Sequence, residues 1–224
     1  MENDEHDAFY GCPVGETVSR PSQNVPTLKG ALHTHTSCSD GELKPQELLE
    51  VYHRLGFDFV ALTDHDFLLQ PAAYDNVPDE FEKVLVFKGV EKTVFARGYF
   101  HVTELHGDSE MLNMFAHPAD YNLPVDRIIE RIQEIQAMMP LHAVEVTSKG
   151  FYTAEFDIDQ IPYPKVASDD CHTREGCGRA WIEVACEKDR DAILRTIKAG
   201  GARACLRSAA HQPAFMENGE AICG

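Results

Sequence analysis

Histidine and carboxylate residues that could bind metal ions recur at the ends of apolar, strand-like runs. Most of them fall in five short motifs: LHTHTSCSDG (32–41), LTDHD (62–66), FKGVE (87–91), MFAHP (114–118) and SDDCH (168–172); a further histidine lies in GYFHV (98–102). The nine candidate ligands are His33, His35, Asp40, His65, Glu91, His101, His117, Asp170 and His172. Imidazole and carboxylate groups are ligands for Zn, Mn or Fe, and nine exceed what one tetrahedral ion can use. The pattern therefore predicts more than one metal ion.

The first motif places two imidazoles on one side of a strand. His33 and His35 form an H-x-H pair, and side chains in a strand alternate between its two faces. One such pair is a weak signal. The full set is stronger, because six separate histidines buried without partners would be costly.

The elements that position these residues follow from apolar periodicity. Helical patterns occupy 45–55, 125–138 and 189–199, and apolar strand-like runs lie between them. Strands that alternate with helices favour a mostly parallel α/β arrangement. In barrel-like α/β folds the carboxyl ends of the strands converge on one face, so ligands that are far apart in the chain would meet there.

Composition restricts the class of protein. The chain has 224 residues, 37 Asp+Glu, 20 Lys+Arg and 11 His, with a formal net charge of −17 and 43% hydrophobic residues. This is a globular composition. The acidic balance argues against a stable nucleic-acid partner, because binding a phosphate backbone requires an excess of Lys and Arg. A small anionic substrate would have to be held by something local, and bound metal ions would meet that need.

Cysteine usage and the chain ends give expectations about location and boundaries. Seven scattered cysteines with no C-x-x-C pair favour reduced thiols over a disulfide framework. No apolar run approaches a membrane span and the start lacks the order of a secretory signal, so a cytoplasmic protein without membrane contact is expected. We expect an irregular arm at 1–27, one metallohydrolase domain at 28–207 and a tail at 208–224.

The five motifs, in this order, resemble the PHP (polymerase and histidinol phosphatase) family over about residues 28–200. The opening KGALHTHTSCSDG and YHRLGFDFVALTDHD are similar to the branch that includes bacterial carbaryl hydrolases. The resemblance implies a distorted (β/α)7 TIM-like barrel with two to three divalent ions. It also implies a metal-dependent hydrolase, most simply a phosphoesterase.

The resemblance also implies which residues share an ion. His33, His35, Glu91 and Asp170 would surround the first; Glu91 would bridge to a second, held also by His101 and His117; Asp40, His65 and His172 would hold a third. His106 could compete with His101 for the second ion. We prefer His101, which sits within a strand-like run beside an apolar valine, as in the family's motif.

Other residues are candidates for catalysis or substrate contact. We take Asp64, His65 and Arg174 as candidate catalytic residues. Asp64 would either orient the His65 imidazole or cap a helix, and Arg174 would grip an anionic group, with Lys149 and Arg179 as alternatives. Glu145 ends another strand-like run and could touch the site.

Clustered divalent ions would lower the pKa of a bridging water so that hydroxide forms near pH 7 and attacks a phosphate ester. No G-x-S-x-G nucleophile motif occurs. Two alternatives stay open: hydrolysis of a carbamate or carboxylic ester by the same metal cluster, and a non-catalytic, metal-stabilised accessory module.

Overall fold

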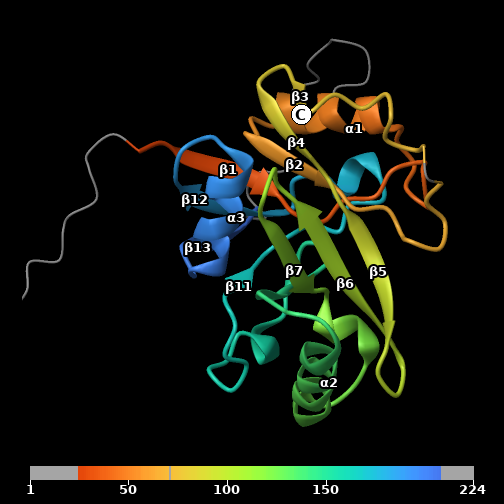
Figure 1. Ribbon diagram of the computed structural model, residues 1–224, viewed down its shortest axis with the longest axis vertical. Helices are drawn as coiled ribbons and strands as arrows, with labels where there is room; N and C mark the ends of the chain where they lie inside the picture. Colours follow the sequence, from red (N-terminus) through yellow and green to blue (C-terminus); the bar gives the residue numbers. More distant parts are fainter. Residues whose placement is uncertain (1–24, 71, 208–224) are drawn as a thin grey trace, which may run out of the picture.

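The computed structural model describes residues 25–70 and 72–207, which form two main sheets and three α-helices (Figure 1). The expected tail at 208–224, and the expected arm as far as residue 24, lie outside the described residues. None of the helices in the described ranges is both long enough and apolar enough to cross a membrane.

The first sheet has six strands in the order β13-β12-β1-β2-β4-β3. They are β1 (Thr27–Ala31), β2 (Phe59–Leu62), β3 (Glu80–Phe81), β4 (Val84–Lys88), β12 (Ala180–Ala185) and β13 (Ala202–Leu206). β1, β2 and β4 run parallel, and Phe59 pairs with Gly30 on one side and Leu85 on the other. β12 is antiparallel to β1 and β13, and β3 is antiparallel to β4. Three parallel carboxyl ends therefore lie next to one another.

The second sheet has five strands in the order β11-β8-β7-β6-β5. They are β5 (Val90–Phe95), β6 (Tyr99–His106), β7 (Met111–Phe115), β8 (Ala143–Glu145) and β11 (Lys165–Val166). β7, β8 and β11 are parallel, whereas β6 is antiparallel to β5 and β7. A separate hairpin pairs β9 (Thr147–Ser148) with β10 (Phe151–Tyr152).

The chain passes from the first sheet to the second at Gly89, which separates β4 from β5. The Gly89 N–H donates to the Leu62 carbonyl at 2.8 Å. A Cβ at this position would lie 2.5 Å from the Glu104 carbonyl oxygen, so only glycine fits so close an approach of two backbones. An isolated parallel bridge between His65 and Glu91 brings the ends of β2 and β5 together at the same place.

The three helices form where the apolar periodicity predicts them. They are α1 (Pro45–Arg54), α2 (Val125–Met138) and α3 (Arg190–Lys198). Proline at the first position of α1 lacks only an N–H that would be unpaired in any case. The Asp189 side chain caps α3 by accepting the Ala192 N–H at 2.9 Å. Short 3-10 helices η1 (Pro118–Tyr121), η2 (Ala154–Phe156) and η3 (Arg174–Gly176) lie between the strands.

Each helix buries one apolar face. Leu48, Leu49 and Tyr52 of α1 pack with first-sheet residues, and Ile128, Ile132 and Ile135 of α2 pack with second-sheet residues. α3 places Ile193, Leu194 and Ile197 in a core shared by both sheets, with Phe59, Phe87 and Met114. Burial of these side chains fixes the two sheets relative to each other and thereby positions their carboxyl ends.

We expected a closed (β/α)7 barrel, but the strands of the described residues do not pair into one. The two sheets are open, and they approach each other through the His65–Glu91 bridge and where β11 contacts β13. Direct hairpin links join β5, β6 and β7, so helices cannot alternate with these strands as a parallel barrel requires. The architecture is a mixed α/β fold with parallel strands at the centre of the first sheet and on one side of the second.

Candidate metal centre

The structure brings all nine predicted ligands together at the carboxyl ends of the parallel strands. Donor atoms within 4.8 Å of one another define four overlapping groups: His35, Asp40, His65 and His172; His33, Glu91 and His117; His33, His35 and Asp170; and His65, Glu91 and His101. Seven of the nine residues follow β1, β2, β7 or β11, whereas Glu91 lies at the start of β5 and His101 lies within β6. Segments that are distant in the sequence therefore converge because parallel strands end at a common face.

Glu91 lies at the centre of the cluster, buried to 1% exposure. Five imidazole nitrogens surround its carboxylate at 2.9–3.3 Å: His33 Nε2, His35 Nε2, His65 Nδ1, His101 Nδ1 and His117 Nε2. A carboxylate does not need five neighbours of this kind to satisfy its hydrogen bonds. Nitrogen donors that converge on shared carboxylate oxygens are instead typical of ligands around cations.

Two other carboxylates extend the cluster in opposite directions. Asp170 Oδ1 lies 3.5 Å from His33 Nε2 and 3.3 Å from His35 Nε2, in the buried part of the site. Asp40 Oδ2 lies 3.5 Å from His65 Nε2 and 3.3 Å from His172 Nε2, and the Asp40 side chain is 44% exposed. The group that contains Asp40 is therefore the outer edge of the centre, where a substrate can approach.

The carboxylates change the protonation of the imidazoles. Burial disfavours the charged form of His33, but the charges of Glu91 and Asp170 outweigh burial and raise the pKa of His33 well above its usual value. Burial opposes protonation of His35 as well, and its carboxylate partners raise its pKa to about 10. Burial alone would raise the pKa of Glu91, yet the neighbouring histidines hold it far below its normal range. Positive charge is required among these carboxylates, carried either by protons or by metal ions.

Unpaired atoms give an independent test of whether the cluster suits metal ions. Seven side-chain atoms of the described residues are buried without a hydrogen bond, and four of them are His65 Nδ1, His101 Nδ1, His117 Nδ1 and Asp170 Oδ1. His65 Nδ1 and His101 Nδ1 lie close to Glu91, but without the geometry of a hydrogen bond. A buried polar atom that lacks a partner costs about 1–3 kcal/mol. All four atoms belong to the nine clustered residues, and imidazole nitrogen and carboxylate oxygen both coordinate divalent cations. The residues present therefore fit a metal group.

Glu145, at the end of β8, supports two of the clustered histidines from behind. One carboxylate oxygen, Oε2, accepts the backbone N–H of His117 at 2.8 Å and lies 3.4 Å from His33 Nδ1. A hydrogen bond at Nδ1 favours the tautomer that leaves Nε2 free to bind a metal ion. Its position at the end of a strand was the only sequence signal for this contact.

Asp64 is turned toward the 36–40 loop. Its carboxylate accepts the Thr36 N–H and hydroxyl, both at 2.7 Å, the Ser39 hydroxyl at 2.5 Å, and the Tyr74 hydroxyl. These bonds close the loop that presents Asp40. These contacts occupy its oxygens and suit a residue that positions the neighbouring ligand Asp40, whereas the catalytic role of Asp64 stays a prediction.

The cationic candidates lie outside the cluster. Arg174 opens η3, two residues after His172, and its backbone N–H contacts the Glu42 carboxylate at 3.4 Å. Lys149 is in the turn between β9 and β10, and Arg179 directly precedes β12. Within the described ranges, no carboxylate forms an ion pair with the side chain of any of the three. Arg174 stays a predicted substrate contact.

His106 and His101 occupy different environments although both belong to β6. His106 is half-exposed and its Nε2 lies 2.9 Å from Glu104 Oε1, whereas His101 contacts Glu91 in the cluster. Strand alternation explains the separation, because residues five apart in a strand point to opposite faces.

A disulfide joins Cys171 to Cys177, whose Cα atoms are 5.2 Å apart. This finding corrects the expectation of reduced thiols for these two residues. The Asp169 carboxylate accepts the Gly178 N–H and, at 2.8 Å, the Tyr52 hydroxyl, which folds the intervening loop back on itself. Elsewhere in the described ranges the cysteines are free: Cys38, Cys186 and Cys205.

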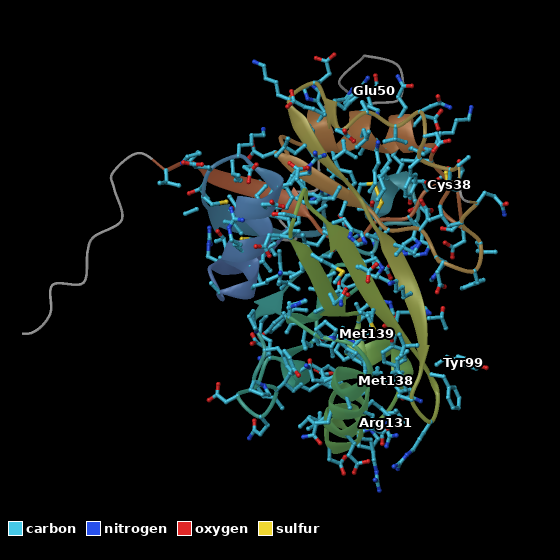
Figure 2. The ribbon with its side chains drawn as sticks, in the orientation of Figure 1. Cys38, Glu50, Tyr99, Arg131, Met138 and Met139 are labelled. Atoms are coloured by element: carbon cyan, nitrogen blue, oxygen red, sulfur yellow. A yellow bond between two sulfur atoms is a disulfide. The ribbon has the colours of Figure 1, made fainter. Side chains whose placement is uncertain are left out.

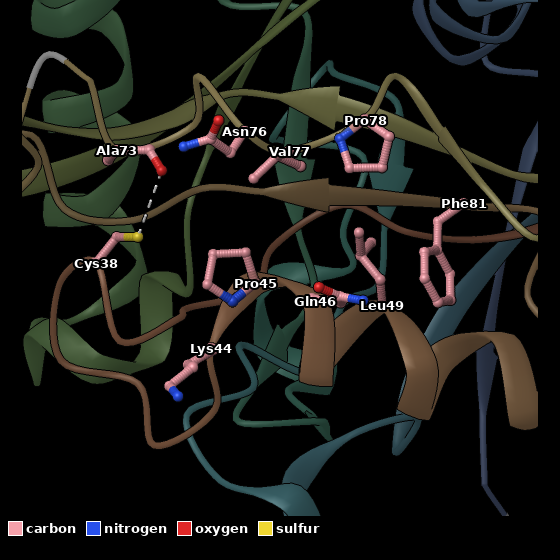
Figure 3. A pocket seen from close by; sticks show the side chains of 10 residues that line it. All are labelled: Cys38, Lys44, Pro45, Gln46, Leu49, Ala73, Asn76, Val77, Pro78 and Phe81. Carbon is pink, nitrogen blue, oxygen red and sulfur yellow. Dashed lines mark hydrogen bonds between the residues drawn. The ribbon is translucent and has the colours of Figure 1, made fainter.

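A pocket of about 510 Å³ lies apart from the cluster, between α1, the 73–78 segment and β3 (Figure 3). Leu49, Val77 and Phe81 supply much of its apolar wall, and Cys38 and Lys44 lie at its polar side. None of the nine clustered residues lines it. The pocket is therefore a separate feature from the candidate metal centre.

Sequence comparison finds two relationships. Residues 154–201, which include Asp170 and His172, match the family model described as PHP-associated. The chain is also 26% identical, over 153 aligned residues, to the DNA polymerase/3'-5' exonuclease PolX of Bacillus subtilis; the match covers 56% of this chain. It spans only 27% of the length of that curated relative.

Comparison with solved structures identifies the fold. A two-domain Bacteroides vulgatus protein that contains a predicted PHP-like metal-dependent phosphoesterase superposes with a TM-score of 0.60 at 18% identity, covering 88% of this chain and 70% of the other. An amidohydrolase from Chromobacterium violaceum gives 0.55 at 16% identity, with coverages of 81% and 99%. PsfC from Pseudomonas syringae gives 0.57 at 13% identity, with coverages of 81% and 92%. The chain shares the mixed α/β fold of these proteins.

Proposed function

We propose that this chain is a metal-dependent phosphoesterase that hydrolyses a small phosphate ester. In the reaction, the oxygen of water bonds to phosphorus, the bond from phosphorus to the leaving oxygen breaks, and a proton passes to that oxygen. The observation that carries the proposal is the cluster around Glu91, in which five imidazoles face one buried carboxylate. The PHP-like fold of the structural neighbours supports it.

The proposed metal group consists of two to three ions of Zn, Mn or Fe, held by the nine clustered residues. Such ions would lower the pKa of water and neutralise negative charge on phosphoryl oxygens. The protein's contribution is to fix the donor atoms. Glu145 orients His33, and Asp64 holds the loop of Asp40. Arg174 is the proposed side-chain contact for the substrate's anionic group.

A substrate panel tests the reaction type. The protein, loaded separately with Mn, Fe and Zn, is assayed with p-nitrophenyl phosphate, bis(p-nitrophenyl) phosphate and a naphthyl carbamate, and its metal-to-chain ratio is measured. We expect turnover of a phosphate ester. Intact phosphate esters with all three metals would overturn the proposal. The assay with the naphthyl carbamate tests the alternative that the resemblance to carbaryl hydrolases implies, which stays a prediction.

Substitution of one clustered histidine separates catalysis from structural metal binding. His65→Ala removes an imidazole that contacts both Glu91 and Asp40 at the partly exposed edge of the centre. We expect loss of turnover with retention of the fold, as measured by circular dichroism. His106→Ala is the matched control, because His106 lies in β6 outside the cluster. If the wild type has no turnover and His65→Ala lowers its melting temperature, the site is structural.

A further inference from the structure

The exposed side of the metal centre has an aromatic neighbour. His33, His35 and Glu91 are at most 1% exposed, whereas side-chain exposure is 12% for His65, 25% for His101 and 30% for His172. A substrate must therefore reach the cluster from the side of these three histidines, of which His65 lies beside both of the others.

Phe67 stands at this side. Its ring centroid is 5.2 Å from that of His65, with the ring planes at 32°, and the residue is 67% exposed. Leu68, also partly exposed at 40%, follows it. A single exposed apolar side chain is common on protein surfaces. An exposed phenyl ring against a candidate metal ligand is more informative, because it provides apolar area beside the reacting group.

The backbone that carries Phe67 is fixed on both sides. The Asp66 N–H donates to the Glu91 carbonyl at 2.9 Å, and the Leu68 and Leu69 N–H groups donate to the His65 carbonyl at 3.1 and 2.9 Å. The Asp66 carboxylate accepts the backbone N–H of Thr93 at 3.1 Å. The backbone that carries the ring is thus fixed beside the centre before any ligand binds, so little ordering of the chain is required on binding.

We propose that Phe67 is a specificity-determining residue that stacks on an aromatic organic group of the substrate, so that the preferred substrates are aryl phosphate esters. This inference rests on the proposed function and names its substrate class. While the phosphate is at the metal centre, an aryl group on the ester oxygen can lie over the phenyl ring. Offset or edge-on contact between aromatic rings is favourable beyond the area that it buries.

The chain supplies a matched control. Phe95 is 63% exposed, as a phenyl ring at the far end of β5, and it packs against Tyr99 with centroids 5.4 Å apart. Tyr99 extends outward from the end of the β5–β6 hairpin, away from Cys38 in the loop of the first motif (Figure 2). Phe95→Ala removes a similar exposed ring without changing the centre.

Binding and kinetics together test the proposal. Calorimetry compares phenylphosphonate with methylphosphonate, neither of which is an ester, on metal-loaded wild type, Phe67→Ala, Phe67→Tyr and Phe95→Ala. We expect wild type to prefer phenylphosphonate by about 3- to 10-fold. Phe67→Ala should abolish the preference, whereas Phe67→Tyr and Phe95→Ala should keep it. In parallel, Phe67→Ala should raise KM for phenyl phosphate by a similar factor, with kcat within about twofold.

The two proposals fail in distinguishable ways. If wild type prefers phenylphosphonate through Phe67 but hydrolyses no phosphate ester, the proposed function is wrong and the aromatic contact stands. If phosphate esters are hydrolysed but Phe67→Ala weakens phenyl- and methylphosphonate equally, or Phe95→Ala has the same effect as Phe67→Ala, the inference is overturned. Circular dichroism of each variant ensures that only folded protein is compared.

Discussion

Glu145 offers the sharpest test of how the fold prepares the metal centre. It is 1% exposed, and a single oxygen accepts the His117 N–H at 2.8 Å and faces His33 Nδ1 at 3.4 Å. Glu145→Ala leaves a buried N–H without a partner and leaves the His33 tautomer unfixed. Loss of a carboxylate that orients a metal-binding histidine typically costs 10- to 100-fold in metal affinity, or about 1.4–2.7 kcal/mol. The unpaired N–H should cost about 1–3 kcal/mol of folding stability.

The conservative variant Glu145→Gln should fall between wild type and Glu145→Ala. Its amide oxygen can occupy the Oε2 position and keep both contacts, so only the negative charge is lost. Thr147, whose hydroxyl donates to the Ser168 carbonyl at 2.7 Å, can still accept from the new amide group. We expect a loss of metal affinity of less than about tenfold, because the acceptor geometry persists.

The assay is competition for Zn²⁺ with a chromophoric chelator, combined with urea unfolding of the metal-free protein. Glu104→Ala is the control, because Glu104 is also a buried glutamate of the second sheet but pairs with Lys92 and His106 outside the centre. It should change stability and leave metal affinity unaltered. A folded Glu145→Ala protein with wild-type Zn²⁺ affinity would refute the reasoning.

Four further predictions concern the residues in and around the candidate metal centre. Asp64→Ala, which removes the acceptor of four side-chain and backbone bonds, should lower the urea-derived unfolding free energy by about 3 kcal/mol; Asp66→Ala should cost under about 1 kcal/mol. Because His33 and His35 have raised pKa values in the metal-free fold, Zn²⁺ binding at pH 7 should release protons, measured by calorimetry in buffers of different ionisation enthalpy. The protonated forms of these two histidines should stabilise the metal-free protein fully below pH 6.5. For His35 this contribution to the unfolding free energy should be lost as the pH rises toward about 10. Chelation of the metal should lower the melting temperature, since a ligand at 100 times its Kd stabilises by about 2.7 kcal/mol.

Local patterns in the chain predicted the elements and the residues that meet. The three helices occupy the expected segments because apolar periodicity and the proline and glycine residues at their ends act over a few neighbouring positions. The nine clustered residues could be chosen because each sits in a short motif at or near a strand. The acidic net charge argues against a broad nucleic-acid interface, and this expectation, which rests on composition alone, stays a prediction.

Tertiary structure decided what each polar residue contacts. Glu91 is central because Gly89 lets β4 continue into β5 at a close backbone crossing, and no local pattern specifies which five imidazoles then face it. Asp64 and Glu145 end strands much as the clustered residues do, but one holds a loop and the other supports two histidines. The open arrangement of the two sheets likewise depends on long-range packing. The sequence determines which chemical groups are available at each position. Which distant residues then contact one another is determined only when burial of the core fixes the sheets relative to each other.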